Sequence, residues 1–206
     1  MVCGLLDIIG VHVYTPDSMR KGDWINPKGR FEGPDTVALH QKSRDDWLAG
    51  KKDIGYYEEK YAGAILAIRD KGEKAPAWAF KTKLSIVLPV IEKYLDNVNI
   101  IATFRSPVGR ALSVQKLSRA HGAIKDFTWC LKRTTNSYDI LVDKLAEAKS
   151  PILFTSYEWM RKNAVAEANR MAEFLELPLP PEEKILEFIE PGYSTIEEKK
   201  EKIVFI

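Results

Sequence analysis

The stretch from Val98 to Ser113, V-N-I-I-A-T-F-R-S-P-V-G-R-A-L-S, constrains the fold more than any other part of the chain. Its first half is a short apolar run rich in β-branched residues, which is typical of a buried, parallel strand. Arg105 ends the run, and Ser106 and Pro107 supply a helix N-cap and a first helical residue. The segment predicts a strand, a sharp turn and a helix, with a cation at the strand's carboxyl end, where open α/β sheets bind ligands.

Arg105 and Ser113 are the first candidate ligand-binding residues. The guanidinium of Arg105 offers a planar fork of donors that suits phosphate or sulfate. Ser113 lies eight positions after Arg105, about two helical turns along the predicted helix. The alternative for Arg105 is structural: it caps the helix or pairs with a surface carboxylate.

A second strand ends in the same way. The apolar run from Ala75 to Phe80 is followed by Lys81 and then by a helical segment. Lys81 and Arg105 are 24 residues apart, which is the length of one β-α-β crossover. Cations at the carboxyl ends of two parallel strands meet at one edge of the sheet, so the sequence predicts an anion site there.

These two strands and a third, Pro151 to Thr155, predict an α/β fold with a mainly parallel sheet and helices on both faces. Helical spacing of apolar residues predicts the helices, and Gly10 is the expected C-cap of the first. The predicted helices are Val2–Ile9, Asp35–Leu48, Tyr56–Lys71, a segment to Leu95 that Pro89 breaks or delays, the segment after Pro107, Asp126–Ala148, Ala164–Leu175 and Glu182–Ile189.

The charge balance limits the classes of partner. The chain has 31 basic and 29 acidic side chains and a formal charge of +2, so any anion site is local and no nucleic-acid partner is expected. No apolar run approaches a membrane span, so no membrane partner is expected either. Cys3 and Cys130 lack the spacing of a disulfide framework or a metal site, so we expect a reducing, cytoplasmic location and no metal.

The segment from Gly22 to Asp35 is a predicted loop, because glycine, proline and asparagine set its turns. It carries charged side chains, Glu32 among them, next to Trp24 and Phe31. A loop of this composition can line a pocket. The alternative is a solvated surface loop.

Three blocks of the chain, together with their order and spacing, resemble the sulfotransferase family, whose donor is 3′-phosphoadenosine 5′-phosphosulfate. The first is I-I-A-T-F-R-S-P-V-G-R-A-L-S, which is similar to the family's 3′-phosphate motif. The second is W-A-F-K-T-K-L, which is similar to its strand-ending lysine motif. The third is P-I-L-F-T-S-Y-E-W-M with A-E-F-L-E-L-P, and the loop N-P-K-G-R-F-E also resembles one in bacterial members.

The resemblance covers nearly the whole chain and implies one domain over residues 1–206 with a P-loop NTPase-like three-layer sandwich. The family's first strand and glycine-rich 5′-phosphosulfate loop would precede Met1, so we expect a chain truncated at its amino end relative to the family. On that basis we expect weak or absent turnover. We also expect either self-association, which includes a possible homo-oligomer, or replacement of the strand by another segment, for which Lys202–Ile206 is one candidate.

The resemblance also implies roles for single residues. Lys81 stabilises the charge on the leaving group, and Arg105 and Ser113 hold the donor's 3′-phosphate. Tyr157 packs on the adenine. Lys83 stands where cytosolic members have a catalytic histidine, which leaves Glu32 as the candidate base. The alternative for Glu32 is a loop carboxylate paired with Lys28 or Arg30.

Two functions follow from the resemblance. The first is transfer of a sulfuryl group to a hydroxyl or amine of a small-molecule or carbohydrate acceptor. The alternative is a non-catalytic relative that binds a nucleotide or a sulfated ligand. The missing loop favours the alternative, whereas Lys81, Arg105 and Ser113 favour the enzyme, because core packing needs none of them.

Overall fold

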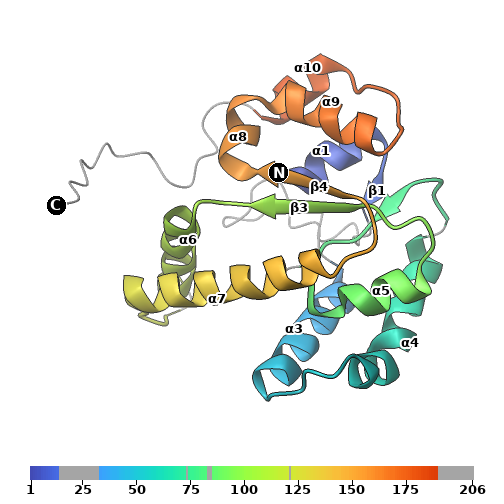
Figure 1. Cartoon of the computed structure of the whole chain (residues 1–206). Helices are drawn as coiled ribbons and strands as arrows, with labels where there is room; N and C mark the ends of the chain where they lie inside the picture. The colour runs from blue at the N-terminus through green and yellow to red at the C-terminus, as the bar shows by residue number, and fades with distance from the viewer. Residues whose placement is uncertain (14–32, 73, 83–84, 121, 190–206) are drawn as a thin grey trace.

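The computed structural model describes residues 1–13, 33–72, 74–82, 85–120 and 122–189 of the chain (Figure 1). Helices alternate with short strands through these ranges. The helices are α1 (Val2–Ile9), α3 (Pro34–Leu48), α4 (Ile54–Gly72), α5 (Leu88–Tyr94), α6 (Pro107–Ala120), α7 (Phe127–Ala146), α8 (Tyr157–Lys162), α9 (Ala164–Phe174) and α10 (Glu182–Phe188), and a 3₁₀ turn, η1 (Ser85–Val87), precedes α5. The strands are β1 (His12–Val13), β2 (Trp78–Ala79), β3 (Ile100–Phe104) and β4 (Ile152–Ser156).

The helix ends follow from local chemistry. Gly10 ends α1 in the left-handed conformation with a φ of 97°, as the sequence predicts. Asp126 caps α7, because its side chain accepts a hydrogen bond from the Trp129 N–H at 2.7 Å. Pro89 delays α5, which begins at Leu88 after the 3₁₀ turn. The predicted helices are confirmed to within two residues at each end.

The strands pair in parallel, as predicted. β3 and β4 pair along their whole length, from Ile100 opposite Ile152 to Phe104 opposite Ser156. β1 and β2 form a second parallel pair, in which His12 lies opposite Trp78. Within the described ranges the strands therefore form two ladders of two strands each. The fold is mixed α/β with small parallel sheets.

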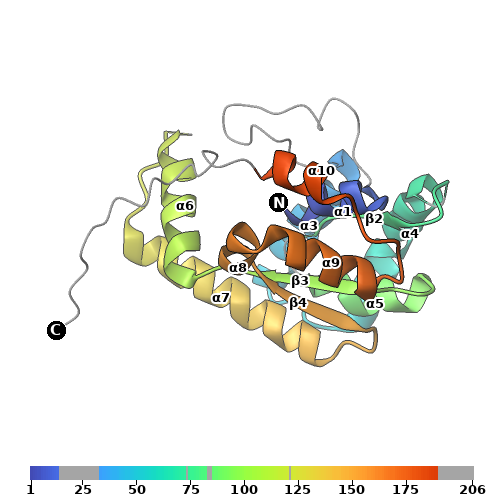
Figure 2. The same ribbon diagram turned by 90° about the horizontal axis from the view of Figure 1, so that it is seen from above.

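Side chains that alternate along the strands pack against two groups of helices. Ile101 and Leu153 contact a buried cluster to which α1, α9 and α10 contribute. Ile100 and Ile152 contact a different cluster that includes Leu145 of α7. Figures 1 and 2 show the same arrangement, with α8, α9 and α10 on one side of β3 and β4 and α7 on the other. This alternation places β3 and β4 between two layers of helices, and their parallel pairing brings their carboxyl ends to the same edge.

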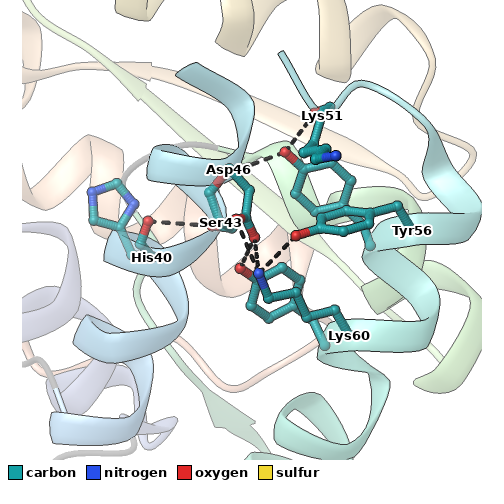
Figure 3. Close-up of polar contacts among 8 residues, drawn as sticks. His40, Ser43, Asp46, Lys51, Tyr56 and Lys60 are labelled. Atoms are coloured by element: carbon teal, nitrogen blue, oxygen red, sulfur yellow. Dashed lines mark hydrogen bonds and ion pairs between the residues drawn. The ribbon is translucent and has the colours of Figure 1, made fainter. Parts of the chain in front are cut away.

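A polar cluster joins α3 to α4 (Figure 3). The carboxylate of Asp46 accepts hydrogen bonds from the Lys60 ammonium at 2.7 Å and from the Tyr61 hydroxyl, and these bonds lower the pKa of Asp46. The Tyr57 hydroxyl donates to the Lys51 carbonyl at 2.9 Å, and burial raises the pKa of Tyr57 to about 12. The bonds of Asp46 join α3 to α4, and that of Tyr57 ties α4 to the connection between them, so the cluster holds the two helices together.

In the described residues, no helix combines the length and the apolar character needed to cross a membrane.

Candidate functional site

The turn between β3 and α6 carries Arg105 and Ser106, as the sequence predicts. β3 ends at Phe104 and α6 begins at Pro107. The Ser106 hydroxyl accepts a hydrogen bond from the Gly109 N–H at 3.3 Å, and its carbonyl accepts one from the Arg110 N–H at 2.8 Å. The side chain of Ser106 therefore caps the helix, which leaves the Arg105 guanidinium available for other contacts.

The end of β4 lies beside this turn, because the last pair of the β3–β4 ladder is Phe104 opposite Ser156. The Ser156 hydroxyl accepts a hydrogen bond from the Trp159 N–H at 3.2 Å and caps α8. The next residue is Tyr157. The Arg105 guanidinium carbon lies 4.6 Å from the centroid of the Tyr157 ring, a cation–π distance. The structure thus brings together two of the predicted site residues, Arg105 and Tyr157.

Glu158 links the two turns. One of its carboxylate oxygens accepts a hydrogen bond from the Ser106 N–H at 3.0 Å. The same oxygen lies 4.0 Å from Nε of Arg105, which is ion-pair distance but too long for a hydrogen bond. Nε of Arg105 is buried and has no hydrogen-bond partner in the described part of the chain. The guanidinium therefore keeps unused donor capacity.

Tyr138 of α7 holds the Arg105 backbone from a third direction. Its hydroxyl accepts a hydrogen bond from the Arg105 N–H at 3.1 Å and donates one to the Arg105 carbonyl at 2.5 Å. The Tyr138 ring contacts the Phe104 ring, with 5.8 Å between centroids. The Arg110 guanidinium carbon lies 5.2 Å from the centroid of the Tyr138 ring. The sequence contains no local signal for this contact, because 33 positions separate Tyr138 from Arg105.

Ser113 lies in the middle of α6 and is half-buried. It follows Gly109 by four positions and so shares a helix face with it. A side-chain carbon at Gly109 would lie 3.4 Å from Nε of Arg105, so this face is turned toward Arg105. No hydrogen bond among the described residues joins Ser113 to Arg105, so their pairing in one site stays a prediction.

Lys81 follows β2 by two positions and is half-buried. β2 pairs with β1 and not with β3, so no strand pairing in the described residues places Lys81 beside Arg105. The predicted meeting of these two cations therefore stays a prediction. Glu32, Lys83 and the segment Lys202–Ile206 lie outside the described residues, and so do the roles predicted for them.

Comparison with known families identifies the domain. A family model described as Sulfotransferase domain matches residues 67–202, which is more than half of the chain. The matched segment runs from α4 past α10 and contains Lys81, Arg105, Ser113 and Tyr157. No curated protein and no solved structure matches the chain significantly. The match contains the turn at Arg105 and its partner at the end of β4, and the chain therefore belongs to the sulfotransferase domain family.

Proposed function

We propose that the chain transfers a sulfuryl group from 3′-phosphoadenosine 5′-phosphosulfate to a hydroxyl or amine of a small-molecule or carbohydrate acceptor. Family membership supports sulfuryl transfer in general. The choice of donor is supported by the arrangement around Arg105, where a guanidinium with a buried, unused Nε lies on an aromatic ring. This is the observation that carries the proposal, because a 3′-phosphate needs charged donors and an adenine needs a flat apolar partner.

In this proposal Arg105 binds the 3′-phosphate with its fork of N–H groups, and the Ser113 hydroxyl adds a donor from the next turns of α6. Arg105 covers one face of Tyr157, and the adenine packs on the opposite face. Glu158 keeps the Ser106 backbone in place, and Tyr138 keeps that of Arg105 in place. The chain's own contacts thus preorganise the phosphate-binding turn before ligand arrives.

The donor supplies the sulfuryl group and a phosphate leaving group. In an in-line displacement, negative charge grows on the oxygen that bridges sulfur and phosphorus. Lys81 places a cation at that oxygen and so stabilises the transition state. Glu32 takes the proton from the acceptor hydroxyl while the new sulfur–oxygen bond forms and the old one breaks. No residue in this proposal requires a metal.

The proposal also covers the domain fold and the cellular location of the chain. We assign residues 1–206 to one P-loop NTPase-like domain in which the two described ladders belong to a three-layer sandwich. The alternating contacts of β3 and β4 with two groups of helices support this assignment. A reducing, cytoplasmic location rests on the usage of cysteine, with only Cys3 and Cys130 in the chain.

A transfer assay tests the proposal. The chain is incubated with the ³⁵S-labelled donor and a panel of sugar and phenol acceptors, and labelled product is counted. Label in an acceptor that disappears with Arg105→Ala supports a sulfotransferase. Nucleotide binding without transfer to any acceptor, measured with the same preparation, would instead favour a non-catalytic relative.

A further inference from the structure

A cavity of about 530 Å³ lies between the connection from α3 to α4, the segment of η1 and α5, and the carboxyl end of α7. Tyr57 and Ile86, which are almost fully buried, belong to its lining, and Trp47, Ile54 and Pro89 add further apolar surface. Cavities that bind small molecules have volumes of roughly 300–1,000 Å³ and mostly apolar walls. The size and the lining therefore suit a small molecule with an apolar body.

The cavity lies at the opposite edge of the β3–β4 ladder from the proposed donor site. Lys149 of its lining comes just before β4, where one carboxylate oxygen of Glu92 accepts hydrogen bonds from the Lys149 N–H at 2.9 Å and the Ser150 N–H at 2.7 Å. Arg105 follows the other end of β3, and five strand residues at about 3.3 Å each separate the two edges by roughly 17 Å. In Figures 1 and 2, α6 lies near one end of α7 and α5 near the other. The cavity is therefore separate from the turn at Arg105.

Lysines outnumber glutamates in the lining, whose charged residues are Lys52, Lys93, Lys144, Lys149, Glu92 and Glu147. The two carboxylates are already bound, Glu92 by the N–H groups before β4 and Glu147 by the Lys144 ammonium at 2.5 Å. The Lys93 ammonium pairs with Glu58 of α4. No ion pair among the described residues includes Lys52 or Lys149. The cavity therefore offers two ammonium groups to an anion.

Lys52 lies against the Trp47 ring. Its ammonium is 3.4 Å from the ring centroid and donates a hydrogen bond to the Trp47 carbonyl at 2.8 Å. The Lys144 ammonium lies 5.6 Å from the same centroid, and the Lys144 side chain is only 15% exposed. Desolvation lowers the pKa of Lys52, and the positive charge of Lys144 lowers it further. A bound anion would offset the repulsion between these two ammonium groups.

We propose that this cavity binds a small aromatic carboxylate. The carboxylate accepts hydrogen bonds from the Lys52 and Lys149 ammonium groups, and the ring lies on the apolar surface of Ile54 and Pro89. Cations also attract the face of an aromatic ring, so the lysines favour an aromatic body over an aliphatic one. The site goes beyond the proposed sulfuryl transfer, because neither the donor nor the acceptor occupies it.

Isothermal titration calorimetry of 2-naphthoate with the full chain tests this proposal, with neutral 2-naphthylmethanol and aliphatic octanoate for comparison. Each compound is titrated at two salt concentrations, and once more with saturating adenosine 3′,5′-bisphosphate. The double variant Lys52→Gln/Lys149→Gln is compared with the control Lys74→Gln/Lys184→Gln, which removes two exposed lysines outside the cavity. The single variant Lys149→Glu reverses the charge of an exposed lysine and keeps the contact of Lys52 with Trp47. Circular dichroism checks that all variants are folded.

We expect 2-naphthoate to bind more tightly at low salt, and both cavity variants to weaken its binding roughly tenfold or more. The control variant, Arg105→Ala and the bisphosphate should leave its affinity unchanged. No binding of 2-naphthoate, equal losses in the two double variants, or equal binding of 2-naphthylmethanol would overturn the proposal. Competition between 2-naphthoate and the bisphosphate would also overturn it, because the anion would then occupy the donor site. Tighter binding of octanoate would overturn it in favour of an acyl chain. Binding of 2-naphthoate by a chain that fails to bind the bisphosphate would refute the donor site and support this cavity.

Discussion

The Tyr138 hydroxyl binds both backbone polar groups of Arg105, accepting from its N–H at 3.1 Å and donating to its carbonyl at 2.5 Å. A single side chain of α7 thus satisfies a turn residue that belongs to neither β3 nor α6. The contact couples the packing of α7 to the direction of the Arg105 side chain. Any ligand that Arg105 holds depends on it.

Tyr138→Phe is expected to weaken binding of adenosine 3′,5′-bisphosphate by about 1–2 kcal/mol, because two backbone groups lose their partner while the ring is retained. Isothermal titration calorimetry measures the affinity. Tyr94→Phe is the matched control, since it removes a hydroxyl that donates to Glu58 at 2.8 Å, outside the candidate site. Similar losses in the two variants would show that Tyr138 acts only through general stability.

Glu158 places a negative charge beside the proposed phosphate site, 4.0 Å from Nε of Arg105. Glu158→Gln removes the charge and keeps an oxygen that can accept from the Ser106 N–H. We expect it to bind adenosine 3′,5′-bisphosphate more tightly by roughly 0.5 kcal/mol at low salt, with a smaller gain at high salt. Weaker binding at both salt concentrations would mean that the carboxylate charge itself is required to orient Arg105.

The α3–α4 cluster predicts a pH dependence of stability. The pKa of Asp46 is lowered from its ordinary value of 3.8 by hydrogen bonds from Lys60 and Tyr61, so the unfolded chain binds the proton more tightly than the folded one. The stabilisation is fully present above that ordinary value and is lost as the pH falls below it. Asp46→Asn should therefore lower the free energy of unfolding by about 0.5–1 kcal/mol at pH 7 and by less at pH 3, as measured by urea unfolding. An equal cost at both pH values would contradict the assignment.

Two glycines of α4 should respond in opposite directions to alanine. A side-chain carbon at Gly72 would lie 2.3 Å from the Trp78 ring, whereas nothing lies within 4 Å of one at Gly63. Gly72→Ala is expected to lower the unfolding free energy by about 1–3 kcal/mol through overpacking against β2. Gly63→Ala should raise it by up to about 1 kcal/mol, because alanine favours the helix. Thermal unfolding of both variants measures the difference.

Most of the fold could be predicted from local pattern. The β3–turn–α6 unit was predictable because apolar β-branched residues, an N-cap serine and an N1 proline all favour the same local structure. β1 was missed, because two residues, His12 and Val13, carry no periodicity. The sequence predicts one sheet from three strands, whereas the described residues form two ladders of two strands. The pairing of β2 with β1 could not be predicted, because no local pattern specifies which strands pair.

The candidate site could be predicted in part. The sequence predicts Arg105 because it ends a strand pattern and Tyr157 through the resemblance to the family, and the structure places the guanidinium of one against the ring of the other. Tyr138 and Glu158 act through contacts across 33 and 52 positions, and a local pattern contains no information on such partners. The roles of Lys81 and Glu32 stay predictions. No strand pairing in the described residues places Lys81 beside Arg105, and Glu32 lies outside those residues.

The most direct test measures how one substitution, Arg105→Ala, changes the binding of two nucleotides. Calorimetry measures binding of adenosine 3′,5′-bisphosphate and of adenosine 5′-monophosphate to the unmodified chain and to Arg105→Ala. We expect the bisphosphate to bind more tightly than the monophosphate. Arg105→Ala should weaken the binding free energy of the bisphosphate by about 1.5–3 kcal/mol and change that of the monophosphate little. Equal losses for the two nucleotides, or no loss for either, would contradict the assignment of Arg105 to the 3′-phosphate.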